Sequence, residues 1–230
     1  MFNRFTKQET ATAIAVFFHA IGMIGLLYSG DKEFFIRATP LNLLLSFALL
    51  VWTQQDKNIP FFFFLFGCFA AGVAVEVIGV NTGALFGEYG YGEVLGPKWR
   101  NVPLLIGVNW FIIVYCCGIS IHTLLRKLTD RMHPVEEPDQ RKSLKALSVI
   151  IDGATLAVFF DWLMEPVAVR LGYWSWAGPI PFFNYACWFV ISMLLLLIFH
   201  FTKFNKQNKF AVNLLLIQLM FFLVLRTFMK

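Results

Sequence analysis

The sequence predicts an all-α, polytopic membrane protein with about seven transmembrane helices, and three observations lead to this class. Of its 230 residues 58% are apolar, and 27 are Phe. Only 14% are charged, which is too few for a surface that faces water. Long stretches without Asp, Glu, Lys or Arg recur along the chain, and most can cross about 30 Å of hydrocarbon. Because unpaired backbone cannot cross lipid, each crossing is expected to be a helix.

The expected spans form one integral membrane domain over residues 1–230. In chain order they cover residues 11–28, 38–54, 59–80, 103–124, 146–164, 183–201 and 210–228. The second is the shortest, and whether it crosses completely is left open. The first follows Arg4 and Lys7 as a signal peptide would. It is too long for one and has no small-x-small cleavage site, so we expect it to be retained.

Basic residues orient the expected spans. With seven spans, one side receives the N-terminus, Lys57, the loop 125–145 and the segment 203–209, which together hold 12 of the 19 Lys and Arg residues. By the positive-inside rule this side is cytoplasmic, which predicts a multi-pass protein of the inner (cytoplasmic) membrane with a cytoplasmic N-terminus. The other side holds two long loops, 81–102 and 165–182, rich in Gly, Pro, Tyr and Trp. We expect function near these loops.

The residues do not favour nucleic-acid binding, a disulfide framework or a metal site. The net charge of +5 is modest and its basic residues lie between apolar runs, so nucleic acid is not an expected partner. The four Cys lie inside apolar runs without CxxC spacing, and the four His share no ligand spacing, so neither a disulfide framework nor a metal site is expected.

The mixed-charge segment 125–145, with His133 and Glu136, is interpreted as a solvated linker between two halves of the core.

A parallel internal repeat is expected, with two helix-loop-helix units at roughly 59–124 and 146–201. When the units are superimposed, Glu76 falls on Asp161. The other matched pairs are Gly87 and Gly172, Tyr89 and Trp174, Tyr91 and Trp176, Pro103 and Pro181, and Trp110 and Trp188. Both units would enter the membrane in the same direction. Paired polar positions would then meet at the interface between the units.

Three carboxyl groups at similar depth in the membrane are the candidate catalytic residues. Glu76 lies about one turn before the end of its span. Asp161 and Glu165 stand four residues apart, hence on one face of the fifth helix, which Pro166 is expected to end. A buried carboxyl group either pairs with a cation or holds a proton, because burying the bare charge costs several kcal/mol.

Few cations are available to these carboxyl groups. The nearby spans hold no Lys or Arg. Only Arg100 and Arg170, in the flanking loops, could reach the carboxyl groups. At least one carboxyl is therefore expected to be a neutral acid, which is what a proton donor needs. The alternative is that the carboxyls only lock helices together through amide or indole N–H groups. Asp152, nine residues before Asp161, is expected on the other face of the helix.

Aromatic residues crowd both loops and the helices that follow. They are Tyr89, Tyr91, Trp99, Trp110, Tyr173, Trp174, Trp176 and Trp188. An interfacial aromatic belt is one explanation. The other is that the rings line a cavity around the acids, where their negative faces would stabilise a carbocation.

Three segments carry more specific motifs. They are Glu76 to Tyr91 (EVIGVNTGALFGEYGY), Gly96 to Trp110 (GPKWRNVPLLIGVNW) and Asp161 to Trp188 (DWLMEPVAVRLGYWSWAGPIPFFNYACW). With these segments the chain resembles the membrane carotenoid 1,2-hydratases of the CruF type, a family also described as carotenoid biosynthesis proteins. The resemblance covers about half the chain. Leu85 stands where the family pattern often has Pro, and Glu165 where it has Asp.

The resemblance implies a hydratase that uses no cofactor. It would add water across the terminal C1=C2 double bond of an acyclic carotenoid end group, as in lycopene or γ-carotene. Either Asp161 or Glu76 would protonate C2, and Glu165 with the remaining carboxylate would position water. The expected substrate-binding residues are Asn81, Tyr89, Tyr91, Asn109, Trp110, Trp174, Trp176, Asn184 and Trp188. The expected partners are a carotenoid that enters from the bilayer, membrane lipids and other enzymes of carotenoid biosynthesis.

Three competing functions remain open at this stage. A membrane lycopene cyclase would protonate the same alkene but let an internal double bond capture the cation. A proton-coupled transporter of a hydrophobic or small solute would relay protons through the same carboxylates. A scaffold subunit of a pigment-synthesis complex would do no chemistry at all. Asn109 and Asn184, which can help to hold water, favour hydration over cyclisation.

Overall fold

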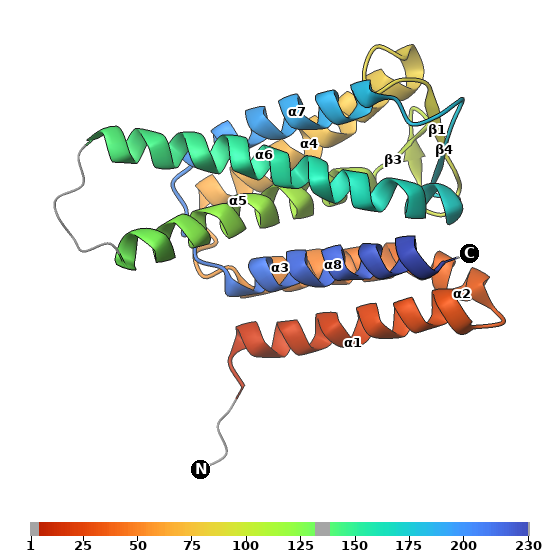
Figure 1. Cartoon of the computed structure of the whole chain (residues 1–230), viewed down its shortest axis with the longest axis horizontal. Helices are drawn as coiled ribbons and strands as arrows, with labels where there is room; N and C mark the ends of the chain where they lie inside the picture. The colour runs from red at the N-terminus through yellow and green to blue at the C-terminus, as the bar shows by residue number, and fades with distance from the viewer. Residues whose placement is uncertain (1–4, 132–138, 230) are drawn as a thin grey trace.

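Long helices make up most of the chain in the computed structural model, which describes residues 5–131 and 139–229 (Figure 1). The helices are α1 (Lys7–Tyr28), α2 (Lys32–Arg37), α3 (Thr39–Thr53), α4 (Ile59–Thr82), α5 (Leu105–Arg131), α6 (Asp139–Arg170), α7 (Phe182–Phe201) and α8 (Lys209–Phe228). Four short strands lie in two loops: β1 (Tyr89–Tyr91), β2 (Lys98–Trp99), β3 (Val102–Pro103) and β4 (Trp174–Trp176). The strands gather at one end of the helices.

Seven helical segments in the described part of the chain are long and apolar enough to cross a membrane, which confirms the predicted class. The second span starts earlier than expected, because Ala38 keeps helical φ and ψ angles between α2 and α3. Together these helices form a 22-residue span, Lys32–Thr53. At 1.5 Å per residue it is about 33 Å long, enough to cross the hydrocarbon layer.

The predicted linker 125–145 is mostly helical, which corrects that expectation. α5 continues to Arg131 and α6 begins at Asp139. The segment 125–131 has no Gly or Pro to stop the helix, and Lys and Arg have good helix propensity. The rest of the predicted linker, including His133 and Glu136, lies in residues 132–138, outside the described residues.

Helix ends follow the local sequence. Thr6 and Glu9 form a capping box at the start of α1. Asn58 accepts a hydrogen bond from the N–H of Phe61 at 3.0 Å and begins α4, with Pro60 in its first turn. Gly83, with φ of +66°, ends the same helix. These signals fix both ends of α4, and Glu76 lies six residues before its last residue.

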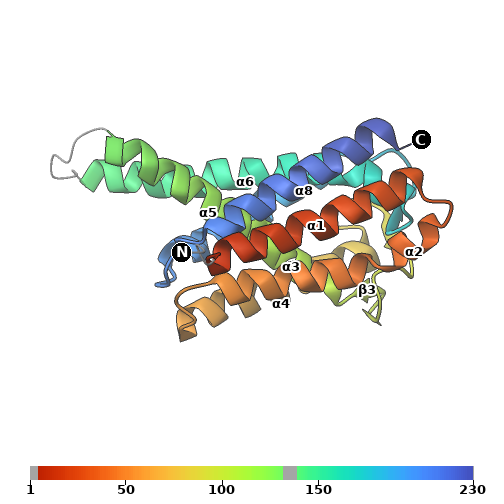
Figure 2. The same cartoon turned by 90° about the horizontal axis from the view of Figure 1, so that it is seen from below.

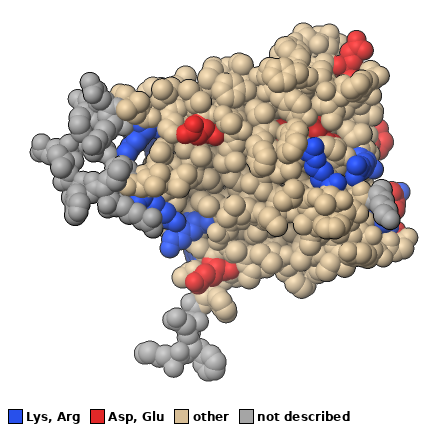
Figure 3. Space-filling view, in the orientation of Figure 1, with Lys and Arg blue, Asp and Glu red and all other residues tan. Residues whose placement is uncertain are grey.

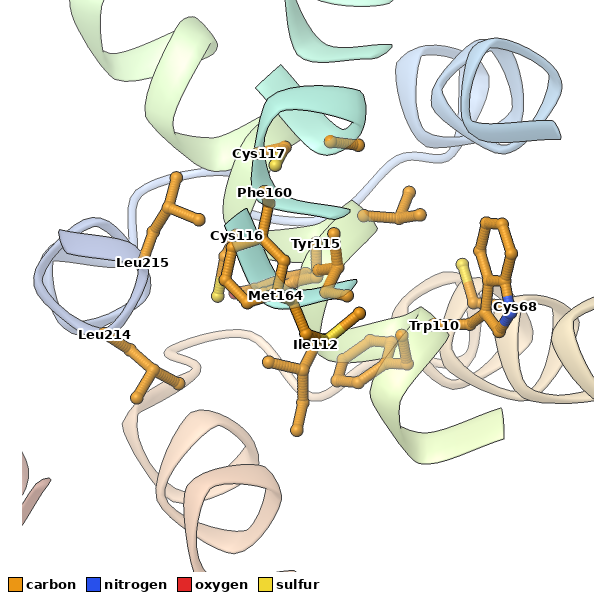
Figure 4. Close-up of a cluster of buried hydrophobic side chains, with 14 of the residues drawn as sticks. Cys68, Trp110, Ile112, Tyr115, Cys116, Cys117, Phe160, Met164, Leu214 and Leu215 are labelled. Carbon is orange, nitrogen blue, oxygen red and sulfur yellow. The ribbon is translucent and has the colours of Figure 1, made fainter. Parts of the chain in front are cut away.

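Helix α5 is the centre of the bundle. It packs against α3, α4, α6, α7 and α8, and residues 110–119 are all buried. Figure 4 shows Tyr115, Cys116 and Cys117 of this helix among side chains of α6 and α8. Its span is more deeply buried among its neighbours than any other described span.

The outer helices complete two layers. α3 and α8 pack on α5, and α1 packs between α8 and α3 on their outer side (Figure 2). The start of α1 and the end of α8 lie at opposite ends of the bundle, as seven crossings require (Figure 1). Most of the face in Figure 3 carries no charge, as expected of a surface that faces lipid.

Two antiparallel strand pairs organise the long loops. β1 pairs with β4 in the register Tyr89–Trp176, Gly90–Ser175 and Tyr91–Trp174, which ties the two loops together. β2 and β3 form a hairpin whose two turn residues, Arg100 and Asn101, both have positive φ angles. The β1–β4 pairing brings residues of the two predicted repeat units face to face. The duplication itself stays a prediction.

The expectation that Pro166 ends its helix is wrong. α6 continues past it to Arg170. Proline has no N–H to donate to the carbonyl of Trp162, four residues earlier. That carbonyl accepts a hydrogen bond from Arg226 Nη1 of α8 at 2.5 Å instead, so the helix loses no partner and carries on.

Candidate active site

A pocket lies between α4, α5, α6 and α7, at the end of the bundle that carries β1 and β4. Its volume is about 20 Å³, room for about one water molecule. The structure brings all three candidate carboxyl groups to this pocket, together with eight of the nine predicted substrate-binding residues. The lining residues are Glu76, Phe86, Tyr89, Tyr91, Ile106, Asn109, Trp110, Asp161, Met164, Glu165, Trp174, Trp176, Asn184 and Trp188.

Glu76 is surrounded by hydrogen-bond donors. Its Oε2 accepts from the hydroxyls of Tyr89 at 2.5 Å and Tyr91 at 2.7 Å, and its Oε1 accepts from Trp110 Nε1 at 3.0 Å. Burial raises the pKa of both Tyr89 and Tyr91, and the nearby charge of Glu76 raises it further. Both phenols therefore keep the protons they donate. Because an ionised carboxylate only accepts, three donors are the set of partners that suits a charged Glu76.

Two glycines let these donors reach Glu76. A Cβ at Gly72 would lie 2.6 Å from the Trp110 side chain, and a Cβ at Gly79 would lie 2.8 Å from Tyr89 Oη. Gly72 is four residues before Glu76 and Gly79 three after it, so both share its face of α4. Sequence reasoning missed these positions. The signal was the spacing of two glycines around an acid within the membrane.

Asp161 has one oxygen satisfied and one without a partner. Its side chain is fully buried, and Oδ2 accepts from Asn184 Nδ2 at 2.8 Å. Oδ1 is buried and has no hydrogen-bond partner among the described residues. Leaving a buried polar atom unsatisfied is costly, and such exceptions call for a ligand, a water or a catalytic role. Oδ1 is therefore available to a ligand or a water in the pocket.

Glu165 takes its partners from strand β4. Its Oε2 accepts from Trp174 Nε1 and from Trp176 Nε1, both at 3.0 Å. Side chains two residues apart on a strand point to the same face, which is why a W-x-W pattern can deliver two indoles to one carboxyl. The Y-x-Y pattern of β1 does the same for Glu76, and pairing of the strands brings Tyr89 and Trp176 within 5.0 Å, ring to ring.

Stacked indoles support the pocket from α5 and α7. The Trp110 and Trp188 rings stack in parallel, with their centroids 4.0 Å apart and an interplanar angle of 12°. Trp110 also donates to Glu76, so the stack fixes the direction of that hydrogen bond. The matched tryptophans of the two predicted repeat units therefore meet at the pocket.

Neither Arg100 nor Arg170 reaches the carboxyl groups. The Arg100 guanidinium lies over the Trp99 ring, 5.5 Å from its centroid, and Arg170 donates to the carbonyl of Met229 at 2.6 Å. Both ion pairs found in the described part of the chain involve other residues, Arg37 with Glu33 and Lys98 with Glu93. The carboxyls of the pocket are therefore held by neutral donors. Among the residues that the structure describes, no group of three or more His, Cys, Asp or Glu is arranged to bind a metal ion.

Asn81 lies outside the pocket that the other eight predicted substrate-binding residues line. It is exposed; its Nδ2 donates to the carbonyl of Arg100 at 2.9 Å, and its Oδ1 accepts from Asn101 Nδ2 at 3.1 Å. Both partners are the turn residues of the β2–β3 hairpin. Asn81 thus fixes this turn, with its positive φ angles, to the end of α4.

Asn81→Ala is therefore expected to affect stability rather than catalysis. Losing these hydrogen bonds should lower the free energy of unfolding by about 1 kcal/mol, since exposed hydrogen bonds contribute modestly. Turnover should stay within about twofold of wild type, as for most surface substitutions. Denaturant unfolding in detergent and pigment turnover measure the two effects. A loss of turnover without a loss of stability would return Asn81 to the substrate site.

The fold and this pocket define a polytopic membrane protein with three buried carboxyl groups around one aromatic site. The family model described as "Carotenoid biosynthesis protein" matches residues 39–230, and the chain belongs to this family. This match confirms the resemblance that the motifs predicted. It includes every residue of the pocket.

Comparison with curated proteins and with solved structures adds two findings. The bisanhydrobacterioruberin hydratase of Haloarcula japonica is 25% identical over 214 residues, which cover 87% of this chain and 67% of that protein. The chain is thus similar to a carotenoid hydratase. No solved structure matches the chain.

Proposed function

We propose that the protein is a membrane enzyme of carotenoid biosynthesis that adds water to the terminal C1=C2 double bond of an acyclic carotenoid end group. One observation carries this proposal: three buried carboxyl groups, held only by neutral donors, meet at a pocket with room for about one water molecule. Similarity to a protein named as a carotenoid hydratase supports the reaction class.

Asp161 is the proposed general acid. Its proton, carried on Oδ1, goes to C2 of the alkene. The π electrons form the new C2–H bond, and a tertiary cation is left at C1. Asp161 becomes a carboxylate whose Oδ2 still accepts the amide N–H of Asn184. A positioned acid of this kind commonly contributes about 10²–10⁴-fold to a rate.

The cation at C1 is stabilised by charge and by aromatic faces. Glu76, an ionised carboxylate in this proposal, provides a fixed negative charge in a site from which bulk water is excluded. The rings of Tyr89 and Trp176 in the pocket wall offer their negative faces to the cation. The three donors to Glu76 hold its carboxylate in place before the reaction starts.

Glu165 is the proposed base that activates water. Two indole N–H groups hold its Oε2. A water bound between Glu165 and the substrate attacks C1, and its lone pair forms the C–O bond. The released proton passes to Glu165 and returns to Asp161, one turn away on the same helix face. The sum is alkene plus water giving a tertiary alcohol, with no cofactor or metal.

The substrate is proposed to enter from the bilayer, where carotenoids dissolve. The end group needs more room than one water, so the walls must move apart to admit it; Met164 is the flexible apolar side chain of the lining. Location in the inner membrane with a cytoplasmic N-terminus, contact with membrane lipids and association with other enzymes of the pathway belong to the same proposal. They rest on the charge distribution and on the chemistry of the substrate.

Expression in pigment-forming bacteria tests the proposal. The gene is expressed in strains that accumulate lycopene, γ-carotene or bisanhydrobacterioruberin. The pigments are then separated, and their masses are determined by mass spectrometry. A pigment heavier by one water in at least one strain is the expected result. An isomer of unchanged mass would instead indicate a cyclase. Unchanged pigments in every strain, with folded protein in the membrane, would contradict hydration and leave the transporter and scaffold alternatives.

A further inference from the structure

Helix α6 contains a gap in its hydrogen bonding close to the pocket. Pro166 lacks the N–H that would normally bond the carbonyl of Trp162. In a membrane a free carbonyl costs several kcal/mol, so proline is tolerated where a neighbouring helix supplies a donor. Arg226 of α8 supplies it here: its Nη1 donates to the Trp162 carbonyl at 2.5 Å.

Arg226 is held in place by a second contact. Its guanidinium carbon lies 3.8 Å from the centroid of the Trp162 ring, within the range of a strong cation–π interaction. The flat guanidinium group can stack on the indole and still point an N–H at the carbonyl of the same residue. One residue of α8 thus binds both the backbone and the side chain of Trp162.

The gap falls between two of the proposed catalytic groups. Trp162 directly follows Asp161, and Pro166 directly follows Glu165. The orientation of the turn between them therefore sets the position of one carboxyl relative to the other. In the same region Phe160 of α6 packs edge-to-face on Phe222 of α8, with ring centroids 5.6 Å apart. α8 therefore packs against this part of α6, and none of the residues that line the pocket comes from α8.

We propose that Arg226 is a positioning residue for the site. By bonding the carbonyl that Pro166 leaves free, it holds α6 in the shape that directs both Asp161 and Glu165 into the pocket. It does not act as their counter-ion, since none of its nitrogens comes within 4.0 Å of a carboxylate oxygen of the described residues. The activity readout of this inference rests on the proposed function.

A pair of substitutions isolates the role of the carbonyl. Arg226→Met keeps an apolar arm of similar length but removes the donor, and should lower kcat on the order of 10- to 100-fold, the size of effect that small misplacements cause. KM should change by no more than about threefold, since the pocket walls are intact. Pro166→Ala in the Arg226→Met background restores a backbone N–H to the Trp162 carbonyl. The double variant should recover at least about half of the wild-type kcat, because the missing hydrogen bond is replaced.

Thermal unfolding in detergent gives a readout that does not depend on activity. Arg226→Met should lower the unfolding midpoint, and adding Pro166→Ala should restore most of the loss. The inference is overturned if Arg226→Met turns over like wild type, or if the double variant stays as inactive and as unstable as the single one. Should wild type hydrate no carotenoid, the proposed function fails, and the thermal data alone then decide whether Arg226 and Pro166 are coupled.

Discussion

Asp161→Asn is expected to abolish hydration while the protein stays folded. The amide has nearly the same shape and still offers an oxygen to Asn184, but it has no acidic proton to give to C2 of the alkene. A loss in kcat of about 10²–10⁴-fold is expected, the usual contribution of a general acid. Pigment turnover in membranes, normalised to the amount of folded protein, measures it.

Asp152→Asn is the matched control for this variant. Asp152 lies on the same helix, is exposed, and accepts a hydrogen bond from Ser148 instead of facing the pocket. It should therefore keep wild-type turnover. Equal turnover of Asp161→Asn and wild type would remove Asp161 from the acid role and would support a scaffold function instead.

Glu76→Gln is expected to damage both the site and its stability. If the amide nitrogen faces Trp110, two N–H donors oppose each other. If it faces the tyrosines, both phenols lose their acceptor. Either arrangement leaves buried donors unsatisfied, at a cost of about 1–3 kcal/mol in unfolding free energy. Loss of the negative charge near the C1 cation should slow turnover by about 10²–10³-fold, as for other electrostatic stabilisers.

Two further variants qualify the result for Glu76. Glu88→Gln makes the same chemical change at an exposed position of the adjacent loop and should leave turnover and stability unchanged. Tyr89→Phe removes one of the three donors and should give an intermediate loss in both measurements. If Glu76→Gln lowered stability but kept full turnover, Glu76 would only join helices together, as the competing interpretation of the carboxyls holds.

The helices could be predicted because a segment that crosses lipid must be a long apolar helix, and such segments are visible in the sequence. Charge-free runs located six of the seven spans, and the fifth, which contains Asp152 and Asp161, is apolar over the rest of its length. The ends were less certain: Pro166 did not stop α6, because a side chain from α8 replaced the missing N–H. That donor, Arg226, was missed although a basic residue in the last span is itself a signal of function. No local pattern predicts which distant helix supplies a partner.

The sequence indicated which residues gather at the candidate site, but it did not indicate which of them contact one another. The three carboxyls and most of the aromatic residues that the sequence singled out line one pocket. Superposition of the two units matched Glu76 with Asp161, yet the structure gives the W-x-W donors to Glu165. Residues one turn apart share a helix face, so spacing alone cannot separate them. Asn81 lies outside the pocket, and its contacts could not be predicted because they depend on the β2–β3 turn, which forms only in the folded loop.

Isotope labelling of the product tests the central claim, that buried acids protonate the alkene and water captures the cation, most directly. The enzyme is supplied with its acyclic substrate once in D₂O and once in H₂¹⁸O, and the pigment is analysed by mass spectrometry and NMR. The account predicts one non-exchangeable deuterium at C2 and one ¹⁸O in the tertiary hydroxyl at C1. Deuterium without solvent oxygen would show cyclisation, and a hydroxylated product without deuterium on carbon would contradict proton transfer from the carboxyl site.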